Sequence, residues 1–599
     1  MLGLDKLGKT ANRLASTFET KVREGQQHLE KLLGDTGVMD YAKSSTLSEM
    51  SDAYRAMAKD LLLHPWRLAG AELELARKYA DLGSYTVARL NGIDKEPAAP
   101  ADSDDRRFRA EEWHRNLPFD VLHQAYLINS RAFLDWVENM EGIPPAGHEQ
   151  MLFYARQLTS ALAPSNFLAT NPEALKITWE RKGMNLVDGG KQFIDDFRQN
   201  PKLFNVGMTD RSAFEVGRNL ATTPGKVVFQ NDLMQLIQYT PTTDTVCKRP
   251  LLIVPPWINK YYILDLSPKN SFIQWLVSQG QTVFIISWRN PGPELRDKGW
   301  DDYMVEGPLA AMEAVTAATG EEKMNLIGYC IGGTLLASAL AWLKKKGRDP
   351  VVSATYLASL LDFSDPGGIG VFINEHSIRG IERAMNKKGY LDGRAMAFTF
   401  NLLRENDLFW SFWTNSYLKG QKPTAFDLLY WNTDSTNLPA KMHSFYLREM
   451  YLNNRLVQPD ALTFAGETIN LGEIEVPSFF LSARQDHIAK WKTTYKGALA
   501  HGGNVHFVLS GSGHIAGVIN PPYKEKYSYW TNDPMKPDAD KWLASADEHH
   551  GSWWPHWLEW IQQYAGDQVT ARTPGDGKLA VIEDAPGSYV LVKAKEAAE

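Results

Sequence analysis

Hydrophobic residues near the start of the chain recur at the spacing of an α-helix. Leu7, Ala11, Leu14, Phe18 and Val22 are separated by 4, 3, 4 and 4 positions, with Lys, Arg, Glu and Gln between them. This period places the apolar side chains on one face of a helix and the charged side chains on the other. The pattern predicts an amphipathic helix within residues 1–36, which either packs on its own domain or contacts a partner or an interface.

Helical periodicity continues, with one break, to about residue 222. A second helical block spans about 46–91, and the Pro-, Ala- and Asp-rich run at 94–107 predicts an exposed linker. We therefore expect a helical region at 1–93 that associates with a partner or an interface. We also expect a helical domain of interaction or scaffolding type at 108–222. The second domain is predicted from its clearest apolar stripe, which consists of Phe119, Leu122, Tyr126, Phe133 and Val137.

The pattern changes after Pro224-Gly225, where short runs rich in Val, Ile and Phe begin. Strands are predicted at 226–230, 234–240, 250–256, 282–288, 324–329, 351–360, 476–483 and 505–510. Helical patterns lie between several of them, at 270–279, at 307–319 and directly after 329. Alternation of continuous apolar strands with helices predicts an α/β domain with a mostly parallel sheet, which we place at 223–565.

The alternation stops between about 362 and 471. This segment is rich in aromatic residues and predicts either a lid over an apolar pocket or extra helices packed on the core. We favour an inserted cap, because lids exclude water from the site that they cover. Residues 566–599 are expected to form a C-terminal tail. The aromatic residues of the cap are Phe398, Phe400, Phe409, Trp410, Phe412, Trp413, Tyr417, Phe426, Tyr430 and Trp431.

Length and charge narrow the class of protein. A chain of 599 residues is longer than one hydrophobic core usually organises, so we expect two domains or one large decorated domain. Its net charge of -7 argues against a general nucleic-acid binder, which needs a basic surface to displace counterions. Small ligands that carry phosphate groups remain compatible with local Arg and Lys residues.

Two cysteines, Cys247 and Cys330, are too few for a disulfide framework and fit a reducing compartment. The N-terminus lacks the apolar core of a signal peptide, and no window is apolar for the length of a membrane span. We therefore expect a cytoplasmic protein without a membrane span.

The first candidate for chemistry is Cys330, in the sequence Gly328-Tyr-Cys-Ile-Gly-Gly333. A predicted strand enters this motif and a Leu- and Ala-rich helix leaves it, which is the pattern of a strained strand-to-helix turn that presents a nucleophile. Glycines flank such a turn because Cβ atoms there would clash. The helix N-terminus also favours the thiolate form of a cysteine. The alternative is a buried cysteine in a glycine-rich turn.

Two further candidates, Asp486 and His514, follow the last two predicted strands. The chain order Cys330, Asp486, His514 is the nucleophile, acid and base order of the α/β-hydrolase fold. His514 would take the thiol proton, and Asp486 would accept the imidazole N–H and fix its tautomer. The alternatives are a helix cap for Asp486 and a loop histidine for His514. His487, beside the acid, is the second choice for the base.

An oxyanion hole needs two amide groups. The first is expected from Ile331, directly after the nucleophile, and the second from the loop after the strand at 250–256. Since the two prolines there have no N–H, Trp257 or Ile258 remains, and we favour Ile258. Cys247 has no base or helix N-terminus near it in the sequence and is expected to be a bystander. No set of His, Cys or carboxylate residues shows metal-ligand spacing, so no metal is expected.

Several long blocks of this chain resemble the class I polyhydroxyalkanoate synthases, the polymerases of bacterial storage polyesters. Together the blocks extend from about residue 108 to 560, which makes the resemblance far more specific than one short motif. The class I type works without a separate partner subunit. The matching blocks are PLLIVPPWINKYYILDL (250–266), VFIISWRNP (283–291), GYCIGG (328–333), FDLLYWNTDSTNLP (426–439), DHIA (486–489), SGHIAGVINPP (512–522) and GSWWPHW (551–557).

The resemblance implies an acyltransferase that polymerises (R)-3-hydroxyacyl-coenzyme A, such as 3-hydroxybutyryl-coenzyme A, and releases coenzyme A. It assigns the acylated cysteine to Cys330 and the partners to His514 and Asp486, and it leaves open which of those two activates the substrate's hydroxyl group. No cofactor is expected, since coenzyme A belongs to the substrate. We also expect a homodimer on the granule surface. The candidates for the substrate channel are Arg404, Trp431 and His487.

Two other functions are compatible with the same fold. One is a cysteine-dependent thioesterase or esterase, which would release free hydroxy acid instead of polymer. The other is an inactive protein of the granule surface. The product formed from 3-hydroxybutyryl-coenzyme A distinguishes the three.

Overall fold

The computed structural model describes residues 65–102, 105–141, 143, 145–199 and 206–594. The amphipathic helix predicted within 1–36 lies outside these residues. The chain divides into two compact units, which are described separately below. Unit 1 runs to Asp210 and includes Phe398–Thr424, and unit 2 contains Arg211–Ala397 and the chain from Ala425 onward.

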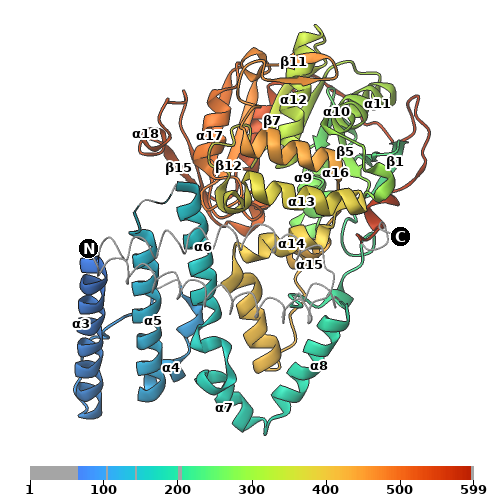
Figure 1. Cartoon of the computed structure of the whole chain (residues 1–599). Coiled ribbons are helices and arrows are strands. Elements are labelled where there is room, and N and C mark those ends of the chain that lie inside the picture. The colour runs from blue at the N-terminus through green and yellow to red at the C-terminus, as the bar shows by residue number, and fades with distance from the viewer. Residues whose placement is uncertain (1–64, 103–104, 142, 144, 200–205, 595–599) are drawn as a thin grey trace. The chain divides into compact units, whose positions relative to one another are not determined.

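Unit 1 is helical, as the sequence predicts for this part of the chain. In Figure 1, α3, α5 and α6 lie side by side as long rods, followed by α7 and α8. Its helices are α3 (Pro65–Leu90), α4 (Glu111–Arg115), α5 (Leu117–Glu138), α6 (Pro145–Ala161), α7 (Pro172–Glu180) and α8 (Met184–Gln199), with short 3₁₀ turns η1 (Arg106–Phe108), η2 (Pro164–Asn166) and η3 (Leu168–Thr170).

The contact between α3 and α5 also includes part of the predicted linker. Leu82, Tyr85, Leu127 and Ile128 form a small core, and Ala99 is buried against it. The amide groups of Ala98 and Ala99 donate to Gln124 Oε1, at 2.8 and 3.3 Å. Most of the described residues of the predicted exposed linker are exposed or half-buried, but Ala99 is buried, because its small side chain fits the helix pair and Gln124 satisfies the backbone there.

The segment 398–424, which was predicted to belong to the cap, packs on the helices of unit 1. Asn185 Nδ2 donates to the carbonyl of Leu418 at 2.7 Å, and Tyr417 donates to Asp196 Oδ2 at 2.6 Å. A Cβ atom on Gly189 would lie 2.0 Å from the Tyr417 carbonyl oxygen, so only glycine allows this approach. The elements of the segment are the end of α14 (Gly393–Leu402) and two π-helical turns, η10 (Asn406–Trp410) and η11 (Trp413–Leu418).

Unit 2 is built on an 11-stranded sheet with the order β15-β14-β13-β12-β7-β6-β4-β5-β2-β1-β17. The six strands from β13 to β5 are parallel, and the strands at both edges are antiparallel. The strands are β1 (Gly225–Gln230), β2 (Met234–Tyr239), β4 (Leu251–Val254), β5 (Val283–Trp288), β6 (Met324–Tyr329), β7 (Val351–Leu357), β12 (Ser478–Ala483), β13 (Val505–Ser510), β14 (Ser528–Thr531), β15 (Asp547–His550) and β17 (Glu583–Asp584). The prediction of an α/β domain with a mostly parallel sheet is confirmed.

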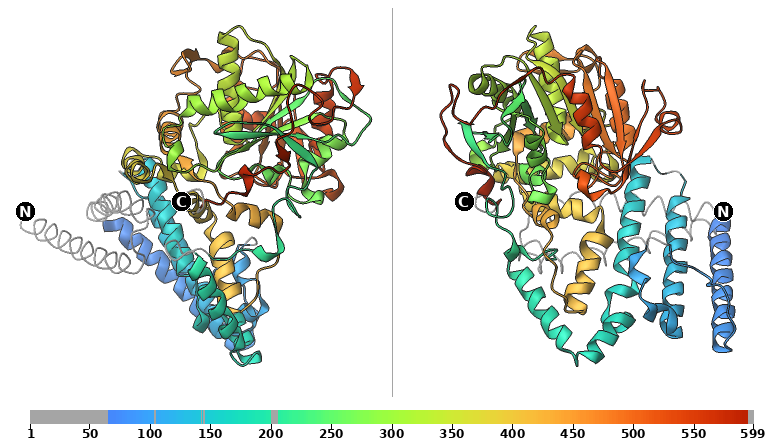
Figure 2. Two further views of the ribbon diagram at one scale, coloured as in Figure 1. Left: turned by 90° about the vertical axis from the view of Figure 1, so that its right-hand side faces the viewer. Right: turned by 180° about the vertical axis from the view of Figure 1, so that it is seen from behind.

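Helices cover both faces of this sheet, which Figure 2 shows from two further directions. Successive residues of a strand point to opposite faces. Ile253, Ile285 and Ile327 face one core, which includes α9 (Phe272–Ser278) and α19 (Trp554–Gln562). Gly328 points to the opposite face, where it meets the first turn of α12 (Ile331–Lys345). The other helices beside the sheet are α10 (Trp300–Met304), α11 (Ala310–Thr319), α17 (Trp491–Leu499) and α18 (Ala539–Leu543).

The part of the predicted cap that belongs to unit 2 is mainly helical. It contains α13 (Glu375–Lys388), α15 (Asp427–Thr433), α16 (Ala440–Phe445) and the π-helical turn η12 (Tyr446–Leu452), with a hairpin of β10 (Leu462–Phe464) and β11 (Glu467–Ile469) and a short ladder of β8 (Tyr390–Leu391) and β9 (Leu438–Pro439). An ion pair buried on both sides, Lys260 with Asp434 at 3.0 Å, joins the C-terminal end of α15 to the loop after β4.

The C-terminal residues extend the sheets of unit 2. Strand β16 (Gln568–Thr570) pairs with β3 (Thr245–Cys247), and β17 pairs with β1. Asn437 Nδ2 donates to the carbonyl of Ala594 at 3.1 Å. Residues 568–594 are thus part of the fold, although their sequence shows no strong strand pattern.

Candidate functional site

Cys330 lies between β6 and α12, as the sequence predicts. It caps the N-terminus of α12 with φ 53° and ψ −127°, a conformation that non-glycine residues rarely adopt. Its side chain is partly exposed while both flanking elements are buried. The turn therefore presents a sulfur atom at the carboxyl end of the sheet, where open α/β sheets build their sites.

Two glycines explain how the chain makes this turn. A Cβ atom on Gly328 would lie 2.4 Å from the Cα of Gly333, and one on Gly332 would lie 2.2 Å from the Val254 carbonyl oxygen. Neither distance is possible for a real side chain. The expected reason for glycine two residues before and after Cys330 is confirmed.

Asp486 follows β12 and is held by its own backbone. Its Oδ1 accepts hydrogen bonds from the amides of Ile488 and Ala489, at 2.8 and 2.9 Å. The pairing of β12 with β13 continues past the strand ends, since Gln485 N donates to the Ser512 carbonyl at 2.8 Å. This continuation brings the loop after β12 next to the loop after β13.

His514 lies in that second loop, and its Nδ1 is 2.6 Å from Asp486 Oδ2. The carboxylate can only accept this hydrogen bond, so Nδ1 carries the proton and Nε2 is directed to other partners. Two tryptophans of the block at 551–557 hold the loop: Trp553 Nε1 donates to the Gly517 carbonyl and Trp554 Nε1 to the Val518 carbonyl, both at 3.0 Å. Both indole rings are buried, so the loop is anchored in the core.

Electrostatics link the three side chains. Burial by itself lowers the pKa of His514, but the Asp486 carboxylate and the hydrogen-bonded Cys330 thiol outweigh it and raise that pKa well above its ordinary value. Burial, and then the charges of Cys330 and Asp486, raise the pKa of Tyr329, whose hydroxyl donates to the His514 carbonyl at 3.3 Å. A raised pKa makes His514 a stronger base towards the proton of a neighbouring nucleophile.

The loop after β4, where the second oxyanion donor is expected, is rigidly held. Thr436 Oγ1 donates to the carbonyls of Trp257 and Ile258, the latter at 2.8 Å. The ring of Trp257 is buried among Trp288, Trp300 and Tyr303. Ile331 is the first residue of α12, so its N–H has no partner within the helix.

The remaining predicted site residues lie in different surroundings. His487 follows the acid, but the imidazole bonded to Asp486 is that of His514, and the His487 carbonyl accepts from Gly368 N at 2.9 Å. Trp431 is a core residue whose Nε1 donates to the Lys260 carbonyl at 2.7 Å. Arg404 belongs to unit 1 and forms an exposed ion pair with Asp407 at 2.5 Å. The role of these three residues in a channel stays a prediction.

Two tyrosines that interact electrostatically with Cys330 were not predicted. Burial, and then other groups that include Cys330, raise the pKa of both Tyr446 and Tyr451. Their rings are 5.0 Å apart, and Phe363 contacts both. The sequence signal was their place in the aromatic cap, but the sequence did not show that the π-helical turn η12 packs both rings against Phe363.

Cys247 has the surroundings of a structural residue. Its thiol is buried and accepts from Gln281 Nε2 at 3.3 Å, and burial raises its pKa. The interpretation of Cys247 as a bystander agrees with this environment, because a raised pKa disfavours the reactive thiolate. Among the described residues, no helix has the length and apolar composition needed to cross a membrane.

Comparison with known proteins decides the family. A family model described as the N-terminus of poly-beta-hydroxybutyrate polymerase (PhaC) matches residues 104–276, and the model of the alpha/beta hydrolase fold matches residues 250–521. The chain is 44% identical over 594 residues to a poly(3-hydroxyalkanoate) polymerase of Methylorubrum extorquens, which covers 98% of each chain. The chain belongs to the poly(3-hydroxyalkanoate) polymerase family.

Other poly(3-hydroxyalkanoate) polymerases match at similar identity. The polymerase subunit PhaC of Rhizobium meliloti is 45% identical and covers 92% of this chain and 89% of its own length. The subunit PhaC of Cupriavidus necator is 43% identical and covers 82% of this chain and 83% of its own. The resemblance and the α/β-hydrolase fold predicted from the sequence are confirmed, and the protein is an enzyme of the acyltransferase type.

Proposed function

We propose that this polymerase joins (R)-3-hydroxyacyl units, such as 3-hydroxybutyryl, from coenzyme A thioesters into a polyester through a thioester on Cys330. The observation that carries the proposal is the His514–Asp486 pair beside a cysteine at a strained strand-to-helix turn, in a chain of the polymerase family. A thiol nucleophile suits this substrate, because the sulfur that leaves is chemically like the sulfur that attacks.

The first step acylates the enzyme. His514 takes the proton of Cys330, the thiolate attacks the thioester carbonyl, and a new carbon–sulfur bond forms at Cys330. The developing oxyanion would be stabilised by the amides of Ile331 and Ile258. When the bond to coenzyme A breaks, its sulfur takes the proton from the imidazolium and leaves as a thiol.

The second step lengthens the chain. The hydroxyl group of a hydroxyacyl unit attacks the enzyme thioester, an ester C–O bond forms and the bond to Cys330 breaks. We infer that His514 accepts the hydroxyl proton, because Oδ1 of Asp486 already accepts two amide N–H groups and Oδ2 accepts from His514. Asp486 then stabilises the imidazolium. The proton returns to the Cys330 sulfur as it leaves.

Polymerisation rather than hydrolysis requires that water is kept from the thioester. The support for this is a cluster of aromatic side chains in the cap. Tyr446, Tyr451 and Phe363 pack together, and besides burial the charge of Cys330 contributes to the raised pKa of both tyrosines. Such rings exclude water and contact the apolar acyl chain.

The product assay tests this function. Purified enzyme incubated with 3-hydroxybutyryl-coenzyme A should release coenzyme A and form insoluble polymer, whereas free 3-hydroxybutyrate as the main product would identify a thioesterase. We expect Cys330→Ser to make polymer much more slowly or to hydrolyse the substrate, because an oxygen ester exchanges less readily than a thioester. Polymer formation at the normal rate by Cys330→Ser would refute the role of sulfur.

Location and assembly complete the proposal. Membership of the polymerase family supports action at the surface of polyhydroxyalkanoate granules in the cytoplasm, as a homodimer. The predicted amphipathic helix within 1–36 is our candidate for granule contact. Deleting residues 1–36 should reduce granule association in cells, and unchanged association would refute this role.

A further inference from the structure

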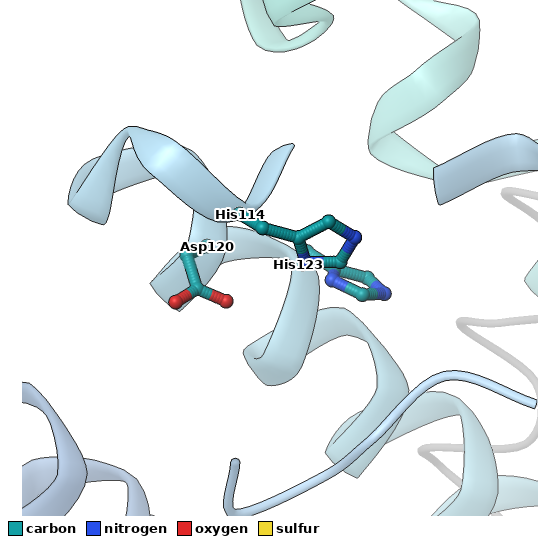
Figure 3. Close-up of side chains that lie close together, drawn as sticks. All are labelled: His114, Asp120 and His123. Carbon is teal, nitrogen blue, oxygen red and sulfur yellow. The ribbon is translucent and has the colours of Figure 1, made fainter. Parts of the chain in front are cut away.

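A cluster of three possible metal ligands lies in unit 1, outside the polymerase site. His114 comes from α4, and Asp120 and His123 come from α5 (Figure 3). One ligand atom from each residue lies within 4.8 Å of the other two. Asp120 and His123 are three positions apart on a helix, which places them on the same face.

His123 is the unusual member, because it is buried and polar without a partner. Only 2% of its surface is exposed, and neither ring nitrogen has a hydrogen-bond partner. Leaving such a buried group unsatisfied costs free energy. Since neither nitrogen is engaged, the ring can offer a lone pair to a metal ion.

His114 and Asp120 each form hydrogen bonds of the kind that orient metal ligands in proteins. His114 Nε2 lies 2.9 Å from the Phe108 carbonyl, so Nε2 carries the proton and Nδ1 has the free lone pair. Asp120 accepts from the Tyr85 hydroxyl at 2.6 Å and from Gln124 Nε2 at 3.0 Å. Each carboxylate oxygen keeps a further lone pair for a metal ion.

We propose that His114, Asp120 and His123 bind a divalent transition-metal ion of the zinc type. Two imidazoles and one carboxylate are a donor set that suits Zn²⁺ in tetrahedral geometry. Ligand atoms around such an ion lie roughly 3.3 Å apart, which side-chain rotations can reach from the present spacing. His114 is exposed, so the fourth position is open to water and the ion has a path of entry.

The bound ion would act as a structural clamp of unit 1. It would join α4 to α5 directly and, through the bond of Asp120 to Tyr85, would fix α3 as well. It would also supply the partner that His123 lacks. This inference does not depend on the proposed polymerisation mechanism. It departs from the expectation of no metal, because the spacing His114-x₅-Asp120-x₂-His123 matches no common ligand motif.

The test uses the full-length protein, treated with a chelator, dialysed and titrated with Zn²⁺ against a chromophoric chelator. We expect one tightly bound equivalent and a rise in the thermal unfolding temperature. Co²⁺ in place of Zn²⁺ should give the intense visible absorption of a tetrahedral site. Asp120→Asn and His114→Gln should each weaken binding at least tenfold, and His114→Gln changes an exposed side chain, so the variant should fold. His148→Ala, in the same unit, should bind as the wild type does.

A second histidine pair makes the test specific. In unit 2, His506 Nε2 lies 2.8 Å from His556 Nε2, so this pair is another place where added metal could bind. His506→Asn should leave the tight equivalent unchanged. The proposal is overturned if the wild type binds no tight equivalent, if His114→Gln binds as tightly as the wild type, or if His506→Asn abolishes binding.

Discussion

Replacing Asp486 by Asn removes one charge from the site and tests how the three side chains work together. The new amide keeps Oδ1, which can still accept from the amides of Ile488 and Ala489, so the loop should fold as before. The group that faces His514 Nδ1 changes from an acceptor to an N–H donor. His514 must then accept at Nδ1 and carry its proton on Nε2, so it can no longer take the proton of Cys330.

The size of the effect follows from the 2.6 Å contact between Asp486 and His514. A hydrogen bond to a charged group contributes about 1.5–3 kcal/mol, which corresponds to roughly 10- to 150-fold in rate. The wrong tautomer adds to this, since the same change in a Ser-His-Asp triad costs about 10⁴-fold in kcat. We therefore expect acylation to slow by between about 10² and 10⁴.

The assay is release of coenzyme A from 3-hydroxybutyryl-coenzyme A in a single turnover, followed with a thiol reagent. Asp533→Asn is a matched control, because Asp533 also lies 2.5 Å from a histidine, His506, but in a more exposed place. The control should react as the wild type does. An Asp486→Asn enzyme within about threefold of the wild type would refute the reasoning.

Three further substitutions test the scaffold. Trp553→Phe removes the donor to the Gly517 carbonyl, so it should lower kcat about tenfold with little change in KM, and an unchanged kcat would show that the histidine loop needs no anchor. Asp434→Asn leaves Lys260 buried without its carboxylate and should lower the free energy of unfolding by about 3–5 kcal/mol in urea titrations, whereas a loss below about 1 kcal/mol would contradict a buried ion pair. Burial holds the pKa of His443 at about 4, below its ordinary 6.5, so the unfolded chain takes up a proton first as the pH falls and stability declines from pH 6.5 towards pH 4. His443→Phe should therefore lose about 2 kcal/mol less stability than the wild type between pH 7 and pH 5, and equal losses would contradict this account.

The strands and the nucleophile turn could be predicted because local sequence determines them. Continuous runs of Val, Ile and Phe are buried on both faces, so each run specifies a central parallel strand without knowledge of its neighbours. A Cβ atom added at Gly328 or Gly332 would lie within 2.4 Å of backbone atoms, so only glycine satisfies that constraint. The positions of Asp486 and His514 could be predicted from strand order, because the carboxyl ends of parallel strands meet at the same edge of the sheet.

Features that depend on long-range packing could not be predicted from the sequence. The sequence predicts that 398–424 is part of a cap, whereas long-range contacts such as Asn185 with Leu418 and Tyr417 with Asp196 place it in unit 1. The apolar stripe of α5 did not predict that Asp120 and His123 are buried. Periodicity locates hydrophobic side chains only, whereas the burial of these two polar residues depends on contacts with other helices. Strands β16 and β17 are edge additions of two or three residues, too short to leave a pattern.

The central claim is that Cys330 carries the growing acyl chain, and mass mapping of the acylated enzyme tests it most directly. The enzyme is mixed with 3-hydroxybutyryl-coenzyme A, quenched with acid within one turnover, digested and analysed by mass spectrometry. The account predicts hydroxybutyryl mass on the peptide that contains Cys330, its presence in Cys247→Ala, and no acylation or coenzyme A release in Cys330→Ala. Acyl mass on another residue, or coenzyme A release that persists in Cys330→Ala, would contradict it.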